Sequence, residues 1–147
     1  MKSTIAFASI LAGCALFDAA HADPAYPINP GYWEAKTVYL GLISATDRWC
    51  IKPKDISKFL SGPSNHIYQC SYPINTAGGG QLHFEGACVD KHGQEIKLSG
   101  QGQYTPTTFH MDATGSGQFM GLPITGDATA DAQFISAECP ADAKSFK

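Results

Sequence analysis

Short apolar runs that alternate with polar residues limit this chain to a fold made of β-strands. In the segment 81–90, QLHFEGACVD, the alternation gives one side with Leu82, Phe84, Gly86 and Cys88 and another with His83, Glu85, Ala87 and Val89, which is the two-residue period of a half-buried strand. From residue 30 onward, runs rich in Val, Ile, Thr, Tyr and Phe are separated by Gly, Pro and Asn. The pattern predicts an antiparallel sheet.

About seven or eight consecutive strands with short turns predict an all-β meander that curls into a small barrel or half-barrel and so hides its edges and its apolar face. The expected strands cover residues 31–41, 44–51, 66–74, 81–90, 94–104 and 108–115, with one or two more between 118 and 139. Glycines favour the curvature because they allow sharp bends or close backbone approach. They stand at 86, 100, 102, 115, 117, 121 and 126. One short helix is expected over residues 53–62, and residues 140–147 are expected to form a frayed tail.

The N-terminus predicts export. Residues 1–22 combine a lysine, an apolar run and a small-x-small triplet that ends at Ala22, as in a secretory signal peptide. Cleavage there leaves residues 23–147 as one domain, with its core at about 30–139. The sequence LAGC at 11–14 has the form of a lipobox, after which cleavage would occur before Cys14. A membrane-anchored lipoprotein is therefore the alternative to a soluble periplasmic protein. No apolar run has the roughly 20 residues that a transmembrane helix needs.

The charge pattern argues against nucleic acid as a partner. The net charge is −3, and the basic residues are scattered along the chain. Phosphate binding requires a concentrated basic surface. The one local group of cations, Arg48, Lys52, Lys54 and Lys58, shares its stretch with Asp47 and Asp55.

Four cysteines in the expected domain predict two disulfides: Cys50, Cys70, Cys88 and Cys139. An even set with no C-x-x-C pair in an exported chain indicates covalent crosslinks, and no metal site or cofactor is expected. Lysines beside Cys50 could lower its thiol pKa, but no nearby histidine completes a nucleophile. Three connectivities are open. We favour Cys50 with Cys70 and Cys88 with Cys139, because residues 51–69 look like one excursion between neighbouring strands.

Several short motifs together resemble one protein family. They are PGYWE near the start of the expected domain, CIKPKD after the second strand, the four cysteines in their order, and a glycine-rich strand series that closes on the last cysteine. In these respects the chain is similar to the DUF3617 family of exported proteobacterial proteins of unknown function, over roughly residues 30–139. The resemblance implies no catalytic residues.

Aromatic residues on nearly every strand suggest a function. A barrel of about eight strands is wide enough for one small ligand, and amphipathic aromatics can line its interior. We therefore expect an uncharacterised periplasmic protein that binds a small apolar or amphipathic ligand. The expected cavity residues are Tyr68, Tyr72, Phe84, Leu98, Phe109 and Met111. The alternative is an accessory module without a ligand cavity that docks to a cell-envelope protein through an edge strand or the basic helix.

An enzyme is the least supported interpretation. The chain has no G-x-S-x-G elbow, P-loop, H-E-x-x-H or dinucleotide fingerprint. His83 and His110 could meet across a sheet and form a metal or acid–base site with Glu85 or Asp112. Strand alternation places these residues on the polar face, so we expect solvated surface residues and no catalytic or metal-ligating group.

Overall fold

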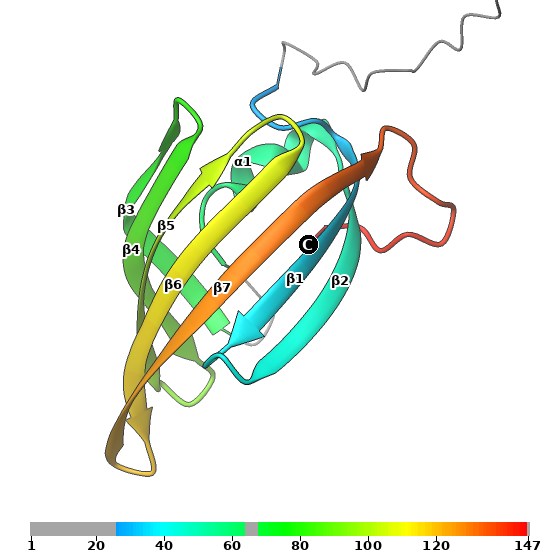
Figure 1. Cartoon of the computed structure of the whole chain (residues 1–147). Helices are drawn as coiled ribbons and strands as arrows, with labels where there is room; N and C mark the ends of the chain where they lie inside the picture. Colours follow the sequence, from blue (N-terminus) through cyan, green and yellow to red (C-terminus); the bar gives the residue numbers. More distant parts are fainter. Residues whose placement is uncertain (1–25, 64–67, 147) are drawn as a thin grey trace, which may run out of the picture.

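The computed structural model describes residues 26–63 and 68–146. Within these residues, seven strands form one antiparallel sheet in the order β2-β1-β7-β6-β5-β4-β3 (Figure 1). The elements are β1 (Gly31–Tyr39), β2 (Ile43–Ile51), the 3-10 helix η1 (Pro53–Asp55), α1 (Ile56–Phe59), β3 (Tyr68–Gly78), β4 (Gln81–Asp90), β5 (Glu95–Tyr104), β6 (Thr108–Phe119) and β7 (Leu122–Ser136). The all-β class, the short helix and two disulfides confirm the predicted fold class.

The strand order departs from a simple meander at one place. Strands β3 to β7 follow one another in the sheet, but the β1–β2 hairpin joins β7 instead of preceding β3. Strand β1 pairs with β2 on one side and with β7 on the other, and its residues Trp33 and Ala35 are buried. Strands β2 and β3 therefore lie at opposite ends of the sheet, which curls into a half-barrel and is not closed (Figure 1).

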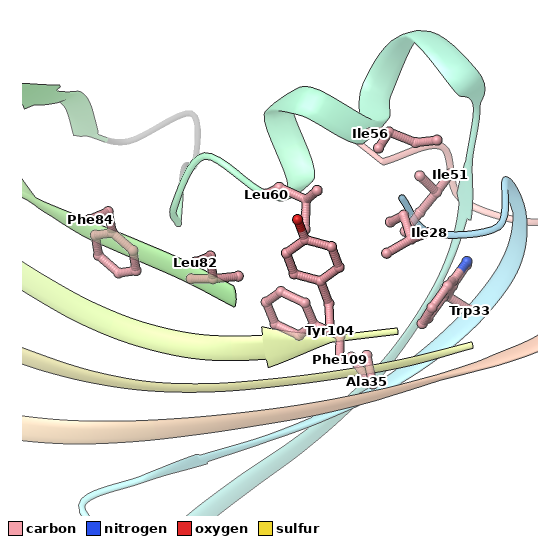
Figure 2. Packing of buried hydrophobic residues seen from close by; sticks show 11 residues of the cluster. Ile28, Trp33, Ala35, Ile51, Ile56, Leu60, Leu82, Phe84, Tyr104 and Phe109 are labelled. Atoms are coloured by element: carbon pink, nitrogen blue, oxygen red, sulfur yellow. The ribbon is translucent and has the colours of Figure 1, made fainter. Parts of the chain in front are cut away.

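The short helical segment covers one half of the concave face of the sheet. Pro53 occupies the first turn, where its missing N–H is not needed, and Leu60 N–H closes the helix on the carbonyl of Ile56. Ile56 and Leu60 are four residues apart, so their buried side chains share the side that points to the sheet (Figure 2). In the described part of the chain, no helix is long and apolar enough to cross a bilayer.

Large side chains fill the space between this segment and the sheet (Figure 2). Trp33 and Phe84 are fully buried, and the indole N–H of Trp33 donates to the carbonyl of Asn29 at 2.8 Å. The rings of Phe59 and Phe109 lie 4.8 Å apart, between the helix and β6. Because burying one such side chain contributes about 1.5–3 kcal/mol, this helix-covered half contains most of the apolar stabilisation.

The favoured disulfide pairing is wrong. Cys50 is bonded to Cys139, and Cys70 is bonded to Cys88. Cys50 is the next-to-last residue of β2 and Cys70 lies on β3, and these two strands are at opposite ends of the sheet, so the two cysteines cannot meet. The described helical residues 53–59 that follow Cys50 lie over the concave face of the sheet instead of leading to a strand beside β2.

Two further expectations concern glycines and the C-terminal tail. A Cβ at Gly86 would lie 2.0 Å from the carbonyl oxygen of Ser71, and one at Gly102 would lie 2.2 Å from that of His110. The curved sheet thus leaves no room for side chains at these positions, as predicted.

The tail is not frayed, because the ring of Phe146 packs edge-on against those of Trp49 and Phe59, at centroid distances of 6.0 and 5.3 Å.

Candidate functional site

The six residues predicted to line a cavity lie in or near the core. Phe84 and Phe109 are buried, and Leu98 and Met111 are half-buried against them. Tyr72 stacks edge-on against Phe84 at 5.1 Å. Tyr72, Phe84, Phe109 and Met111 therefore contribute to the packed core of the helix-covered half, and Leu98 packs against the border of this core.

Tyr68 and Tyr72 differ in their surroundings. The hydroxyl of Tyr72 donates to the carbonyl oxygen of Pro63 at 2.5 Å, and burial raises the pKa of its phenol. Tyr68 is half-exposed at the start of β3, opposite Asp90 at the start of the β4–β5 turn. Their joint role in binding a ligand stays a prediction.

The other half of the concave face is open and apolar. On the concave face, one row of directly paired residues crosses the sheet from β4 to β2. Its members are Phe84, Gly100, Ala113, Ala128, Tyr39 and Ile43. Beyond this row lie the β1–β2 turn and the β6–β7 hairpin, at the end of the sheet away from α1 (Figure 1). We call this region the distal apolar surface. Its residues are exposed Tyr39, Leu40, Leu42, Ile43, Met120, Leu122 and Ile124 and half-buried Ile96 and Leu98.

Glycines form part of the floor of the distal apolar surface and keep it continuous. Gly115 on β6 and Gly126 on β7 are directly paired. A Cβ at Gly115 would lie 3.1 Å from the Cδ2 of Leu98, and one at Gly126 would lie 2.8 Å from the Cδ2 of Leu40. Leu98 and Leu40 thus approach the same pair of glycines from two sides, and the apolar contact extends from β5 to the β1–β2 turn.

Both turns at this end hold an apolar residue in the left-handed conformation. Leu40 has φ 53° and Met120 has φ 51°, and each precedes a glycine that also has positive φ. Asn or Asp is the usual residue before glycine in such turns, because its short polar side chain tolerates this conformation. Leu40 is 58% exposed and Met120 is 85% exposed. Conformational strain and water contact thus both disfavour these residues, which points to a use other than stability.

An open hollow of about 650 Å³ adjoins the same end of the sheet. It lies between the β4–β5 turn and the β6–β7 hairpin. Lys97, Ser116 and Thr125, which pair across the sheet on its convex face, line it together with apolar Met120 and Ile124 at the hairpin. Its volume is within the range of small-molecule sites, about 300–1,000 Å³. Apolar and polar groups side by side suit an amphipathic molecule.

The histidines predicted as alternative site residues lie on the opposite, convex face. His110 Nδ1 is 2.7 Å from Asp131 Oδ1, and Nε2 is 3.2 Å from Asp112 Oδ2. The hydrogen bond to Asp131, followed by that to Asp112, raises the pKa of His110. His83 pairs with Glu85 at 3.0 Å and does not meet His110. The predicted polar, solvated face is confirmed.

Metal binding finds no support in the described residues. No group of three or more His, Cys, Asp or Glu side chains in residues 26–63 and 68–146 is arranged to hold an ion. The four cysteines form disulfides, which removes their thiolates as ligands.

Sequence reasoning missed the distal apolar surface. Two signals could have found it, the apolar turn sequences LGLI at 40–43 and MGLPI at 120–124. Turns between strands are normally polar, and consecutive exposed apolar residues at two turns mark a contact surface.

Comparison with known proteins identifies a family. The sequence profile of the family described as protein of unknown function (DUF3617) matches residues 28–139. This range covers all seven strands of the sheet and all four disulfide-bonded cysteines. No curated protein and no solved structure shows significant similarity to the chain. By the extent of this match, the chain belongs to the DUF3617 family.

Proposed function

We propose that this protein is an exported binding module that holds a small apolar or amphipathic molecule against the distal apolar surface. The observation that carries the proposal is the pair of exposed left-handed residues, Leu40 and Met120. Each is unfavourable for stability, and both are at the same open end of the sheet. Binding that covers them would explain their presence.

The position of the site follows from how the core is filled. Trp33 and Phe84 are fully buried beneath the helical segment, so that half of the concave face is occupied by side chains. The distal half has the same apolar character without the helical cover. Met120 and Ile124 also line the adjoining hollow, so an amphipathic ligand that covers them can extend around the β6–β7 hairpin to its polar residues.

The first test is native mass spectrometry of the protein purified from its own compartment, followed by the denatured mass in the same run. We expect a discrete excess mass that is lost on denaturation. A bare chain that also fails to bind a long-chain fatty acid in titration would contradict the proposal.

Paired variants locate the site. Leu122→Ser combined with Ile124→Ser should weaken fatty-acid binding at least tenfold, because it removes two exposed apolar side chains from the surface. Ile135→Ser is the matched control: Ile135 is an exposed residue of the same strand on the opposite face. Equal loss in both variants would place binding elsewhere.

Docking to a cell-envelope protein is the second candidate function. Two observations favour this function. The core of the helix-covered half is filled by side chains, and Met120 is highly exposed although monomeric proteins rarely expose large apolar patches. A photo-crosslinking residue at position 120 would then yield one discrete protein adduct in cells, while the same residue at position 135 would not. A lipid or small-molecule adduct at position 120 would favour the first candidate.

The proposed location is the periplasm. Two disulfides indicate an oxidising, exported environment, and the first 22 residues have the sequence of a signal peptide. The mass of the mature protein distinguishes the two cleavage sites. A chain that starts at Asp23 supports the soluble form, and a diacylated chain that starts at Cys14 supports the lipoprotein.

A further inference from the structure

One edge of the sheet is left open over most of its length. Strand β2 pairs with β1 on one side. On its other side, among the described residues, the backbone meets the C-terminal tail at Cys50, and the whole stretch from 43 to 48 is exposed. We propose that β2 pairs with β2 of a second copy of this chain, antiparallel and centred on Thr46, so that two half-barrels share one continuous sheet.

The direction of the free backbone groups follows from the contact with the tail. Cys50 N–H donates to the carbonyl of Lys144 at 2.8 Å, and the carbonyl of Cys50 accepts from Phe146 N–H at 3.2 Å. Both groups of Cys50 therefore point away from β1. Because orientation alternates along an antiparallel strand, the N–H and C=O groups of Ser44, Thr46 and Arg48 point the same way.

The two edges of the sheet differ in protection. Strand β3, at the other edge, contains Pro73, and its register shifts between Ser71 and Ile74. Proline and strand irregularities are devices that block pairing between sheet edges. Strand β2 has neither, and its register with β1 is regular over all nine residues. The β2 edge is thus suited to accept another strand.

The accessible length selects the centre of the pairing. A hollow of about 440 Å³ lies beside Thr46, Asp47 and Arg48, between the edge and tail residues 142–144. The tail closes the edge at Cys50. If the two-fold axis passed through Arg48, the two Arg48 side chains would face each other and the second copy would collide with the tail. If it passed through Ser44, Arg48 would lie opposite the β1–β2 turn of the second copy. An axis at Thr46 pairs the whole free stretch.

Side chains fit this register. It places Asp47 opposite Ala45 of the second copy and Arg48 opposite its Ser44, so no like charges face each other directly. Arg48 is already bonded to Glu34 through its Nε at 2.6 Å, which compensates its charge within one copy. Ile43, 64% exposed, comes opposite Trp49 of the second copy. Cross-strand pairs of this kind each contribute about 0.2–1 kcal/mol.

Cysteine crosslinking tests the register. Thr46 is the only residue of the free stretch that faces its own counterpart, at the Cα distance of about 5.5 Å expected for a hydrogen-bonded pair. A disulfide spans about 4.4–6.8 Å, so Thr46→Cys should form a covalent dimer under mild oxidation. Ser44→Cys is the control, because its two copies would be about 13 Å apart, four residues along the strand. Intact mass without reductant measures both, and equal crosslinking would overturn the register.

A second pair of variants tests the edge itself by sedimentation velocity over a range of concentrations. Thr46→Pro removes an outward N–H that makes no bond to β1, so the monomer should keep its circular dichroism while the dimer dissociation constant rises at least tenfold. Thr46→Val keeps the N–H and the branched shape and should dimerise as the wild type does. A wild-type chain that stays monomeric, or dimers unaffected by Thr46→Pro, would overturn the proposal.

Discussion

Gly100 lies beneath the ring of Phe84, so closely that a Cβ at position 100 would be 2.5 Å from two of its ring carbons. The two residues are directly paired on β5 and β4, and Phe84 is fully buried. The glycine therefore provides the space in which the largest aromatic side chain of β4 packs. The curvature of the sheet and the filling of its core depend on the same pair of positions.

Gly100→Ala should destabilise the protein. The added methyl group must displace either the Phe84 ring or the β6 backbone, because the carbonyl oxygen of Asp112 would also lie 2.9 Å away. Overpacking of this kind costs about 1–3 kcal/mol, measurable as a lower midpoint of urea unfolding. Gly78→Ala, where the new Cβ meets nothing within 4 Å, is the control. An equal shift in both variants would contradict the packing argument.

The two disulfides should contribute unequally. Cys50–Cys139 spans 89 residues and Cys70–Cys88 spans 18. On the chain-entropy estimate these loops give about 4.6 and about 3.2 kcal/mol, so the double variant Cys50→Ala with Cys139→Ala should lose about 1.4 kcal/mol more than Cys70→Ala with Cys88→Ala. Unfolding titrations of both measure the difference. Peptide mapping without reductant checks the pairing, and a Cys50–Cys70 peptide would contradict it.

Met120→Asn should leave the fold at least as stable as the wild type. Asn tolerates the left-handed conformation at φ 51° better than Met, so a gain of up to about 1 kcal/mol is expected. Gly121→Ala, at φ 80°, should destabilise the same turn. If Met120→Asn lowers the thermal midpoint, Met120 contributes to stability and the argument for its functional use fails.

His110 should titrate above the ordinary histidine pKa. Its pKa is raised, first by the hydrogen bond with Asp131, so an NMR titration should show a larger downward shift in Asp131→Asn than in Asp112→Asn. Asp127→Asn is the control, since Asp127 accepts from the Thr114 hydroxyl. An unchanged His110 pKa in all three variants would contradict the assignment.

The same cluster predicts a weak pH dependence of stability. A raised folded-state pKa means that the His110 contribution is fully present below about pH 6.5 and is lost as pH rises through that raised pKa. Because the His110 side chain is about half exposed, screening keeps the effect well below about 1 kcal/mol. The difference in unfolding free energy between wild type and His110→Gln should therefore shrink as pH rises from 6 to 8. A difference that grows over this pH range would contradict a raised folded-state pKa of His110.

The sequence predicts the strands well, because the alternation of apolar and polar residues is a local property of each strand. Phe109 and Met111 lie inward and His110 and Asp112 outward, as their alternation requires. The helix at 53–62 was predictable from Pro53 and the nearby charges. These features depend on neighbours within a few residues, which the sequence displays directly.

Pairing between distant segments was not predictable in the same way. The contact of β1 with β7 joins Val38 to Thr129, and the disulfide joins Cys50 to Cys139. Neither contact leaves a periodic signal in the sequence. The pattern of β1 fits any exposed strand edge, so it does not identify β7 as the partner. The distal apolar surface was missed for a related reason: Leu40 and Met120 looked like strand residues until the turns were located.

The disulfides are nested, with Cys70–Cys88 inside the interval closed by Cys50–Cys139. A chain that enters an oxidising compartment N-terminus first presents Cys50 and Cys70 together before Cys88 and Cys139 arrive. Oxidation in order of arrival would link the first two and join opposite edges of the eventual sheet. Correct assembly thus requires Cys50 to stay reduced, or to be released by thiol exchange, until the last strand has emerged. The yield of native protein should depend on disulfide isomerisation more than on oxidising capacity.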